Sequence, residues 1–413
     1  MLAVSVMTAS SQSSTKSPYS QFGLGVLSDR SQGMSRGMNG VGVALQNGNQ
    51  LNTLNPASYG GVDSLTMIID ASVTGQLTNF KEGNTRQNAK TANFEYITAS
   101  FRAWKNVGVA VGILPVSNVG YSYTTKNVIN EEYGTLSESY SGEGGLREAF
   151  IGVGWRVLKP LSVGVNAGYL WGDFNRTVLA TNSKINSQMK SYSATVKSYK
   201  LDAGIQWQQQ MGRHDMLTLG ATLGVGHKLN ADPSLSIISV AEADTTTLTA
   251  KNGLELPWSW AVGMAWKHHN SLTIAADVEL QKWGNTVFPT YAVGNKYAAT
   301  KGLLKDRLSM SAGVEWVPNA TDIRHYLRRV HYRFGAGLTS PYYKIGNQNG
   351  PRDFSVSMGL GLPIQNTYNN RSILNISGQW VRSSAKDFIT ENMFRINIGI
   401  TFNERWFAKW KVE

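Results

Sequence analysis

The chain has 413 residues, a formal net charge of +12 and no cysteine, and only 16% of its residues are charged. The absence of Cys excludes disulfides, thiolate catalysis and Cys-ligated zinc or iron–sulfur sites. Lys and Arg are scattered rather than clustered, so we expect no nucleic-acid partner and attribute the positive charge to attraction toward an anionic lipid surface.

The composition favours many strands over a helical membrane protein. Gly (42), Trp (12) and Tyr (17) are abundant, and mean hydropathy is slightly negative at -0.24. No apolar run approaches the ~20 residues that a transmembrane helix needs. This mix is typical of β-strands with aromatic residues at membrane interfaces.

The first 63 residues do not have a strand pattern. Residues 1–12 predict the remnant of a secretory signal peptide, because an apolar segment leads into small residues, although no basic region precedes it. The alternative is that this N-terminal segment has no targeting function. Residues 13–63 are punctuated by Gly and Asn, as in Phe22-Gly-Leu-Gly25. Some fifty residues without regular structure are unusual unless something encloses them, so we expect a hatch, or plug, here.

From Leu65 onward, alternation of apolar and polar residues recurs. Between 391 and 402, Phe394, Ile396 and Ile398 alternate with Arg395 and Asn397, which gives one apolar and one polar strand face. A soluble sheet with a core would show the same pattern in one strand. Its repetition predicts an all-β, transmembrane antiparallel β-barrel of about fourteen strands over 64–403. The expected strands are 65–77, 93–104, 107–124, 146–157, 161–177, 195–210, 214–230, 256–267, 271–284, 303–316, 329–341, 353–363, 371–383 and 391–402.

The connections support the barrel independently. Those after even-numbered strands are mostly short, whereas 125–145, 178–194, 231–255 and 285–302 are long and polar. Short turns on one side and long loops on the other are typical of outer-membrane barrels. We therefore expect a multi-pass barrel in the outer membrane of a Gram-negative cell, with both termini periplasmic and with outer-membrane lipid and lipopolysaccharide around it.

The sequence offers no catalytic constellation. No Gly-x-Ser-x-Gly elbow, phosphate loop or dinucleotide fingerprint is present. His268 and His269 are adjacent in a predicted turn, and adjacent strand residues point to opposite faces, so a shared metal is not expected. We predict no enzyme, no cofactor and no metal site.

Charged residues fall on the polar strand faces, where they line the predicted lumen. Outward-facing charges would cost roughly 2–4 kcal/mol each at mid-bilayer, so the inward position of these charges supports the assignment of the two strand faces. A salt-bridged lumen explains these residues more simply than a charged substrate path does. The lumen candidates are Asp277, Glu279, Arg307, Glu315, Arg333 and Arg395.

Pro115 interrupts the third predicted strand. Proline has no backbone N–H to donate to a neighbouring strand, and every strand of a closed barrel has neighbours on both sides. A bulge or kink is therefore expected at this position. The functional interpretation is an opening in the barrel wall. The alternative is that the strand ends earlier, at the membrane interface.

The chain resembles the FadL-type family of outer-membrane transporters. Arg36-Gly-Met-Asn-Gly-Val-Gly-Val-Ala44, then Asn55-Pro-Ala-Ser58, then the first strand carry the resemblance, with Leu256-Pro-Trp-Ser-Trp-Ala-Val-Gly263 and 277–283 further on. The resemblance implies a fourteen-stranded, porin-like barrel with a luminal hatch. It also implies uptake of fatty acids or other hydrophobic molecules and lateral release beside a kinked third strand. On that basis Asn55, Pro56, Ala57 and Ser58 would hold the hatch end, and Pro115, Val116, Ser117 and Asn118 would form the lateral opening.

Two additions depart from that family. Residues 404–413 form a basic tail beyond the expected last strand, and 318–328 is a long turn on the same predicted side. Some relatives of the family are subunits of secretion or barrel-assembly machinery. The second hypothesis is therefore a non-transporting barrel in an outer-membrane protein complex, which binds other outer-membrane or periplasmic proteins through this turn and tail.

Overall fold

The computed structural model describes residues 15–130, 134–182, 186–239, 244–292, 296–322, 324–364 and 372–405. The predicted signal remnant (1–12) and residues 406–413 of the predicted tail lie outside the described residues. Within the described residues, no helix is long and apolar enough to cross a membrane.

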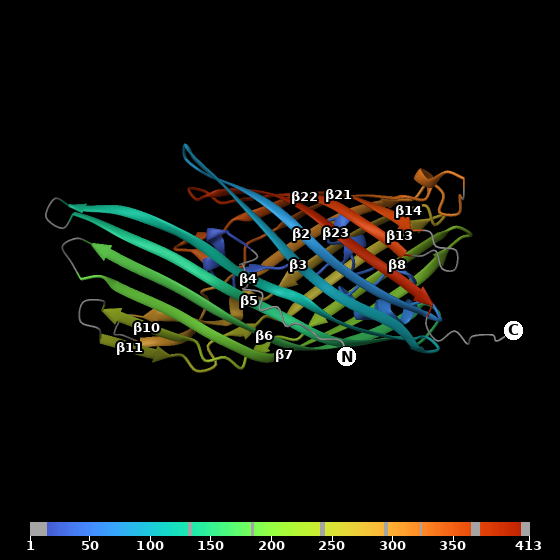
Figure 1. Ribbon diagram of the computed structural model, residues 1–413. Coiled ribbons are helices and arrows are strands. Elements are labelled where there is room, and N and C mark those ends of the chain that lie inside the picture. Colours follow the sequence, from blue (N-terminus) through green and yellow to red (C-terminus); the bar gives the residue numbers. More distant parts are fainter. Residues whose placement is uncertain are drawn as a thin grey trace, which may run out of the picture.

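Fourteen of the described strands form one closed antiparallel barrel, as the alternation predicts (Figure 1). Its seam is the pairing of the first barrel strand with the last, from Thr66↔Arg405 to Lys81↔Thr390. The barrel strands are β2 (Thr66–Glu82), β3 (Thr85–Trp104), β4 (Val107–Asn130), β5 (Gly134–Arg156), β6 (Leu161–Asn182), β7 (Gln188–Met211), β8 (Asp215–Gly224), β13 (Ser259–His268), β14 (Leu272–Gln281), β17 (Arg307–Trp316), β18 (His331–Thr339), β21 (Arg352–Ile364), β22 (Ser372–Ser384) and β23 (Thr390–Arg405).

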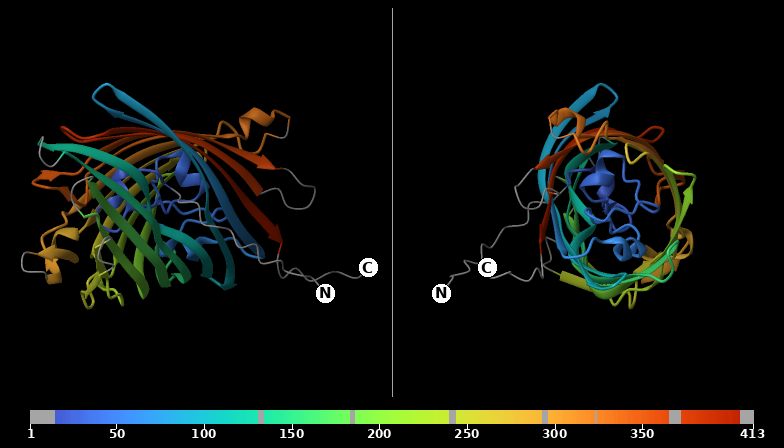
Figure 2. Two further views of the ribbon diagram at one scale, coloured as in Figure 1. Left: turned by 60° about the vertical axis from the view of Figure 1, so that its left-hand side comes forward. Right: turned by 90° about the vertical axis from the view of Figure 1, so that its right-hand side faces the viewer.

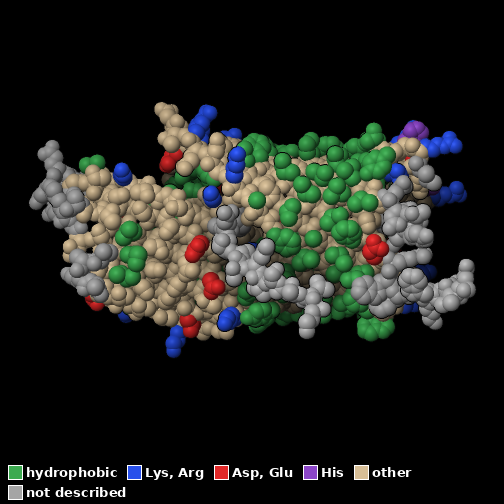
Figure 3. All heavy atoms as spheres, viewed as in Figure 1, with side chains coloured by type: hydrophobic (Ala, Val, Ile, Leu, Met, Phe, Trp, Pro, Cys, Tyr) green, Lys and Arg blue, Asp and Glu red, His purple; other side chains and the backbone are tan. Residues whose placement is uncertain are grey.

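The apolar strand faces point outward and form a belt around one part of the barrel. Ile396 and Ile398 are 61% and 46% exposed, whereas Asn397 between them is 4% exposed. In Figure 3 the belt appears as the green surface over the half of the barrel nearer the C-terminal end of the chain. Burial is therefore inverted relative to a soluble sheet, as expected for strands that face lipid.

Strands extend beyond this belt further than alternation predicts. The segments 125–145 and 178–194, expected to be loops, are mostly the outer parts of β4 to β7, and 231–255 and 285–302 contain short hairpins. The prediction was wrong here because a strand in water, paired through its backbone, needs no apolar face. The shorter strands are β9 (His227–Lys228), β10 (Ser234–Ser239), β11 (Asp244–Thr249), β12 (Glu255–Leu256), β15 (Val287–Ala292), β16 (Lys296–Lys301), β19 (Lys344–Ile345) and β20 (Gln348–Asn349), with the 3-10 turns η3 (Trp283–Asn285) and η4 (Tyr326–Arg328).

Residues 15–63 lie inside the ring of strands, as the end-on view in Figure 2 shows, and we call them the plug. The plug is mostly irregular and contains η1 (Pro18–Gln21), β1 (Val26–Leu27), α1 (Gly33–Gly37) and η2 (Pro56–Gly61). Many of its side chains are fully buried, among them Met38, Leu51 and Tyr59. The barrel thus supplies the enclosure that this Gly- and Asn-rich stretch requires.

Candidate functional site: a plugged lumen with a split wall

The wall of the barrel is interrupted between β3 and β4. Their ladder runs from Trp104↔Val107 to Ile97↔Ile113 and stops. Beyond that point β2 is the one described strand that pairs with β3, and β4 continues to Asn130 along β5. Figure 1 shows the β2–β3 hairpin diverging from β4. We call this break in the ladder the split.

The split coincides with the Pro115 segment. The β4–β5 register shifts between Pro115 and Ser117, and β4 does not end there, so the alternative of a shorter strand is wrong. Pro115 cannot donate a backbone hydrogen bond, which makes it compatible with an unpaired edge. Val116, Ser117 and Asn118 follow on the same edge, facing the plug.

The plug covers this edge of β4 with a two-residue strand. In β1, Val26 pairs with Asn118 and Leu27 with Ser117. Ser28 N–H donates to the Val116 carbonyl at 3.0 Å, and the Asn118 amide donates to Ser28 Oγ at 2.8 Å. Gly25 is required just before β1, because its φ is +92° and a Cβ there would lie 2.4 Å from the Asn118 carbonyl oxygen. A short piece of plug therefore seals the split.

Behind this seal, the lumen is apolar and rich in aromatic residues. Tyr19 and Leu24 of the plug pack in one cluster with Val119, Leu146 and Trp283 of the barrel and its loops. Phe22 stacks on Tyr343 with ring centroids 5.2 Å apart. This part of the lumen suits an apolar molecule better than a hydrated ion.

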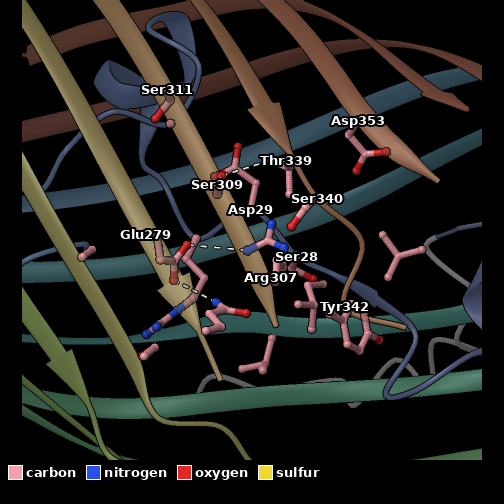
Figure 4. Close-up of a pocket in the computed structure, with 18 of the residues that line it drawn as sticks. Ser28, Asp29, Glu279, Arg307, Ser309, Ser311, Thr339, Ser340, Tyr342 and Asp353 are labelled. Carbon is pink, nitrogen blue, oxygen red and sulfur yellow. Dashed lines mark hydrogen bonds and ion pairs between the residues drawn. The ribbon is translucent and has the colours of Figure 1, made fainter. Parts of the chain in front are cut away.

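A cavity of about 400 Å³ adjoins the cluster, and both apolar and charged side chains line it. Leu27 and Val116 line it beside the split, and Asp29, Arg307 and Asp353 line it elsewhere. Arg307 and Glu279, on the neighbouring strands β17 and β14, form an ion pair of 3.6 Å in the cavity lining, and Figure 4 shows them with Ser309 and Thr339. The cavity is therefore amphipathic, not uniformly hydrophobic.

Buried ion pairs join the plug to the barrel wall. Arg30 of the plug lies 3.0 Å from Glu148 and 3.4 Å from Asp202, and Lys200 completes the group against both carboxylates. Glu148 is fully buried. Removing one member would leave an uncompensated buried charge, which is strongly destabilising. These pairs resist displacement of this part of the plug.

The Asn55-Pro-Ala-Ser58 element anchors the other end of the plug. Asn55 caps η2 by accepting a hydrogen bond from Ala57 N–H at 3.0 Å, and its amide donates to the carbonyls of Val43 and Ile205. Pro56 occupies the first position of η2, and Ser58 Oγ donates to the Asn52 carbonyl at 2.9 Å.

The wall opposite this element carries glycines because the plug backbone touches it. A Cβ on Gly164 would lie 2.4 Å from the Pro56 carbonyl, and one on Gly204 would lie 2.0 Å from Asn55 Oδ1. Real side chains do not tolerate such distances. The glycines of β6 and β7 thus leave the space in which the Asn-Pro-Ala-Ser element packs against the wall.

The six predicted lumen residues all face inward but form separate groups. Asp277 accepts the backbone N–H groups of Gly42 and Val43 at 2.6 and 2.8 Å. Glu315 pairs with Arg333 at 2.6 Å, Glu279 pairs with Arg307, and Arg395 donates to Gln76 at 2.7 Å. Salt bridges thus account for Glu315 with Arg333 and for Glu279 with Arg307, and these six described residues do not form a continuous charged path.

Arg395 differs from Arg307 and Arg333, which both have carboxylate partners. Its hydrogen-bond partners are the amides of Gln76 and Gln379 and the sulfur of Met393, and no described carboxylate lies within 4.0 Å of it. It also lines the cavity. A half-buried guanidinium without an ion-pair partner is a candidate to bind an anionic group of a ligand.

Sequence reasoning missed Glu148, Arg30 and Lys200. The alternation of strand faces could have identified Glu148, since it lies on the inward face of β5 with Phe150 and Gly152. No comparable signal exists for Arg30, because the irregular plug has no period. Lys200 lies between Tyr199 and Leu201, which face outward, and its inward position was not recognised from the sequence.

A protein-family model described as BamG matches residues 1–413, the whole chain. Among curated proteins, none matches. The family label therefore differs from the FadL resemblance that the sequence motifs suggest.

Solved structures match over most of the chain. The Pseudomonas putida toluene transporter TodX has a TM-score of 0.64 at 16% identity, covering 92% of this chain and 99% of TodX. The Ralstonia pickettii toluene transporter TbuX gives 0.61 at 14%, covering 92% and 99%. A Pseudomonas aeruginosa FadL homologue gives 0.60 at 11%, covering 92% and 98%. At these identities the likeness establishes the fold, and the FadL resemblance is confirmed at that level.

The glycine contacts predict how the plug can be released. We expect Gly164→Ala to displace η2, because its Cβ would meet the Pro56 carbonyl, and to leave the barrel folded. The matched control is Gly75→Ala on β2, where a Cβ would meet nothing within 4 Å. Limited proteolysis should cut the plug of the Gly164 variant at least about tenfold faster, while both variants keep the gel mobility of a folded barrel. Equal plug protection in the two would contradict the anchoring role.

Proposed function

We propose that this chain, which belongs to the BamG family, is an outer-membrane barrel that admits small hydrophobic molecules into its lumen and releases them sideways through the split. The observation that carries this proposal is the end of the β3–β4 ladder at Ile97↔Ile113, with the adjoining edge of β4 sealed by two residues of plug. Lateral release suits a hydrophobic cargo because the lipid, not water, is its favourable destination.

The plug makes the axial route unfavourable. Its backbone donates to Asp277, and its Arg30 is paired with Glu148 and Asp202 in a buried group. Passage along the axis would require these charges to separate in a poorly solvated place. Asn55, Pro56, Ala57 and Ser58 hold the hatch against the wall in this proposal.

The side route requires much less disruption. The contacts between the plug and this edge of β4 include the Ser28–Val116 and Asn118–Ser28 hydrogen bonds, and each such bond contributes about 0.5–1.5 kcal/mol. Pro115, Val116, Ser117 and Asn118 form the frame of the opening, and Val26 and Leu27 form its cover. A movement confined to this part of the plug would connect the cavity to the bilayer.

The cavity restricts the cargo. The similar transporters are described as acting on toluene, an uncharged hydrocarbon. In this chain, the apolar cluster around Trp283 suits a hydrocarbon body, and Arg395 suits a carboxylate. We therefore infer that long-chain fatty acids are accepted as well as neutral hydrocarbons.

A disulfide across the seal tests the lateral route in a chain with no other cysteine. Leu27 and Ser117 are cross-strand partners, a spacing that suits a disulfide, so we expect Leu27→Cys with Ser117→Cys to lock the split. Uptake of radiolabelled toluene and oleate by cells should fall about tenfold or more under oxidation and recover on reduction.

The control for this lock is a pair in the intact part of the same ladder. Ala99 and Val111 are partners in the hydrogen-bonded part of the β3–β4 ladder. A disulfide between them joins strands that are already paired. Uptake by Ala99→Cys with Val111→Cys should not respond to oxidation. If the locked seal transports as fast as this control, lateral release through the split is wrong.

The unpaired guanidinium predicts a selective effect. We expect Arg395→Gln to lower oleate uptake about tenfold, by removing the charge that binds the carboxylate, and to leave toluene uptake within about twofold. Arg333→Gln is not a suitable comparison, because it would strand Glu315. Competition between unlabelled oleate and labelled toluene would measure binding separately from transport. Equal loss for both molecules would show a structural role for Arg395 instead.

The described residues of the turn 318–328 favour a second candidate, a barrel that binds other outer-membrane or periplasmic proteins. In 318–328, Asp322 accepts the N–H groups of Arg324 and His325 at 2.9 and 3.0 Å. The hydrogen bond from His325 N–H is the main cause that lowers the pKa of Asp322. Leu327 is nevertheless 70% exposed. An exposed leucine suits protein contact, and the basic tail 404–413 would add to it.

This candidate predicts that Leu327→Glu releases a larger complex that survives mild detergent extraction. Leu158→Glu is the matched control, since Leu158 is 59% exposed in the β5–β6 turn on the same side of the barrel. Native gels of the extracted protein should show the complex with the control and the free barrel with Leu327→Glu. A free barrel in the unmodified protein would count against a docking role.

A further inference from the structure

Cations gather along one part of the border between the apolar belt and the long-loop end of the barrel. In this sector β21, β22, β23, β2 and β3 lie side by side in that order. Figure 3 shows Lys and Arg side chains at this edge of the green surface. The exposed cations of the sector are Lys81, Arg86, Lys90, Arg352, Arg382 and Lys386. We call four of them, Lys81, Arg86, Arg352 and Arg382, the cation band.

The strand register places the two arginines of β21 and β22 just beyond the aromatic border of the belt. Arg382 lies opposite Phe354, and Arg352 lies two residues further along β21. Directly opposed residues share a face of the sheet, and so do residues two apart on one strand. Phe354 is 42% exposed and contacts Trp380 edge-on, with ring centroids 6.0 Å apart. Arg352 and Arg382 therefore point outward, toward the surroundings of the barrel.

Lys81 and Arg86 continue the cation band on the next strands. They lie opposite one another on β2 and β3, beside the turn that joins these strands. Lys81 follows Leu77 by four residues, so both point to the same face of β2. Leu77 is 40% exposed and lies opposite Phe394, an exposed residue of the belt. The outward face is thus apolar up to this row and basic beyond it.

The described carboxylates do not neutralise the cation band. Asp353 and Glu391 face the lumen, where both line the cavity. Glu82 alternates with its neighbour on β2 and so points to the other face, and Asp387 lies beside Lys386 in the β22–β23 turn. No described carboxylate lies within 4.0 Å of any of the four cations. Four like charges without counter-charges favour an anion bound among them.

The height of the cation band identifies the source of the anion. Aromatic rows mark the border of the hydrocarbon layer, and the headgroup layer beyond it is about 5–7 Å thick. Two residues on a tilted strand rise about 5 Å along the membrane normal. Arg382 lies two residues beyond Trp380, and Arg352 lies two beyond Phe354, so both reach headgroup level. A lipid whose acyl chains contact the belt would therefore present its headgroup to these cations.

The side chains around Arg382 suit a phosphorylated sugar. Guanidinium groups bind phosphate through two parallel hydrogen bonds, and Arg352 and Arg382 are diagonal neighbours with Cα atoms roughly 7–8 Å apart. Asn392 lies opposite Arg382, and Asn79 lies opposite Asn392 across the seam. Their amides can donate to and accept from hydroxyls. We propose that the cation band binds the phosphorylated sugar headgroup of an outer-leaflet glycolipid, the chemistry of lipopolysaccharide. This site does not depend on the split or on transport.

Another sector provides a matched control. Arg147 on β5 and Lys197 on β7 both lie opposite Trp171 of β6, and both are exposed. Asp173, two residues beyond Trp171 on the same face, is exposed as well. Glu143 is also exposed, four residues from Arg147 on the same face of β5. These mixed charges would repel a phosphate as well as attract it, so we expect no site there.

The test compares Arg352→Gln with Arg382→Gln against Arg147→Gln with Lys197→Gln, each pair in the full chain. The detergent-purified proteins are titrated with bisphosphorylated lipid A, and native mass spectrometry counts the bound lipid. We expect the first pair to weaken lipid A binding about tenfold, by removing two cations of the site, and the control pair to stay within about twofold. Lipid A without its phosphates should bind the unmodified chain about tenfold more weakly, and added salt should narrow that difference.

Three results would contradict the site. Equal loss in the two double variants would show a general effect of charge, and equal binding of lipid A without phosphates would remove the role of the phosphate. Displacement of lipid A by an equimolar amount of inorganic phosphate would assign the cation band to free anions. Toluene uptake should be unchanged in both double variants, so failure here is distinguishable from failure of the proposed transport.

Discussion

A sheet can cross a bilayer only if its strand edges are hydrogen-bonded to one another, and this constraint governs the whole molecule. The seam between β2 and β23 meets it over the full length of both strands. The β3–β4 ladder meets it only as far as Ile97↔Ile113. Beyond that point the chain uses its own plug to cover the β4 edge. The seal and the cavity beside it are both consequences of that one incomplete ladder.

The plug is held by two unlike kinds of contact, and the difference locates its movable part. Around Asn55 the backbone lies directly on glycines of the wall, and around Arg30 it is fixed by buried ion pairs. At Val26 and Leu27 the contact is a two-residue ladder among apolar side chains. Both strong anchors follow the seal in the chain, and in the proposed function they hold the rest of the plug while the seal moves.

Much of the fold can be predicted from the sequence, because lipid imposes a strict period of two. The last strand, β23, is predictable from Ile396, Ile398 and Ile400 alone, and the proline at position 115 predicts an irregular β4. Polar hairpins such as Thr78 to Asn93 carry no such period, so their pairing was not predictable. The partners of Arg30 were also hidden, since they lie on strands more than a hundred residues away. Distances of that kind depend on barrel closure, which no local pattern encodes.

The position of the plug has a consequence for the order of folding. Thr401 donates to Asp70 across the seam, 331 positions apart in the chain, so the cylinder cannot close until its last strand is available. Loop closure over such a separation is slow, and the plug is synthesised before any barrel strand. The plug must therefore enter a sheet that is still open at the seam, rather than thread into a finished barrel. Its glycine contacts on β6 and β7 would form on that open sheet, and the plug would then serve as the core around which the remaining strands curve.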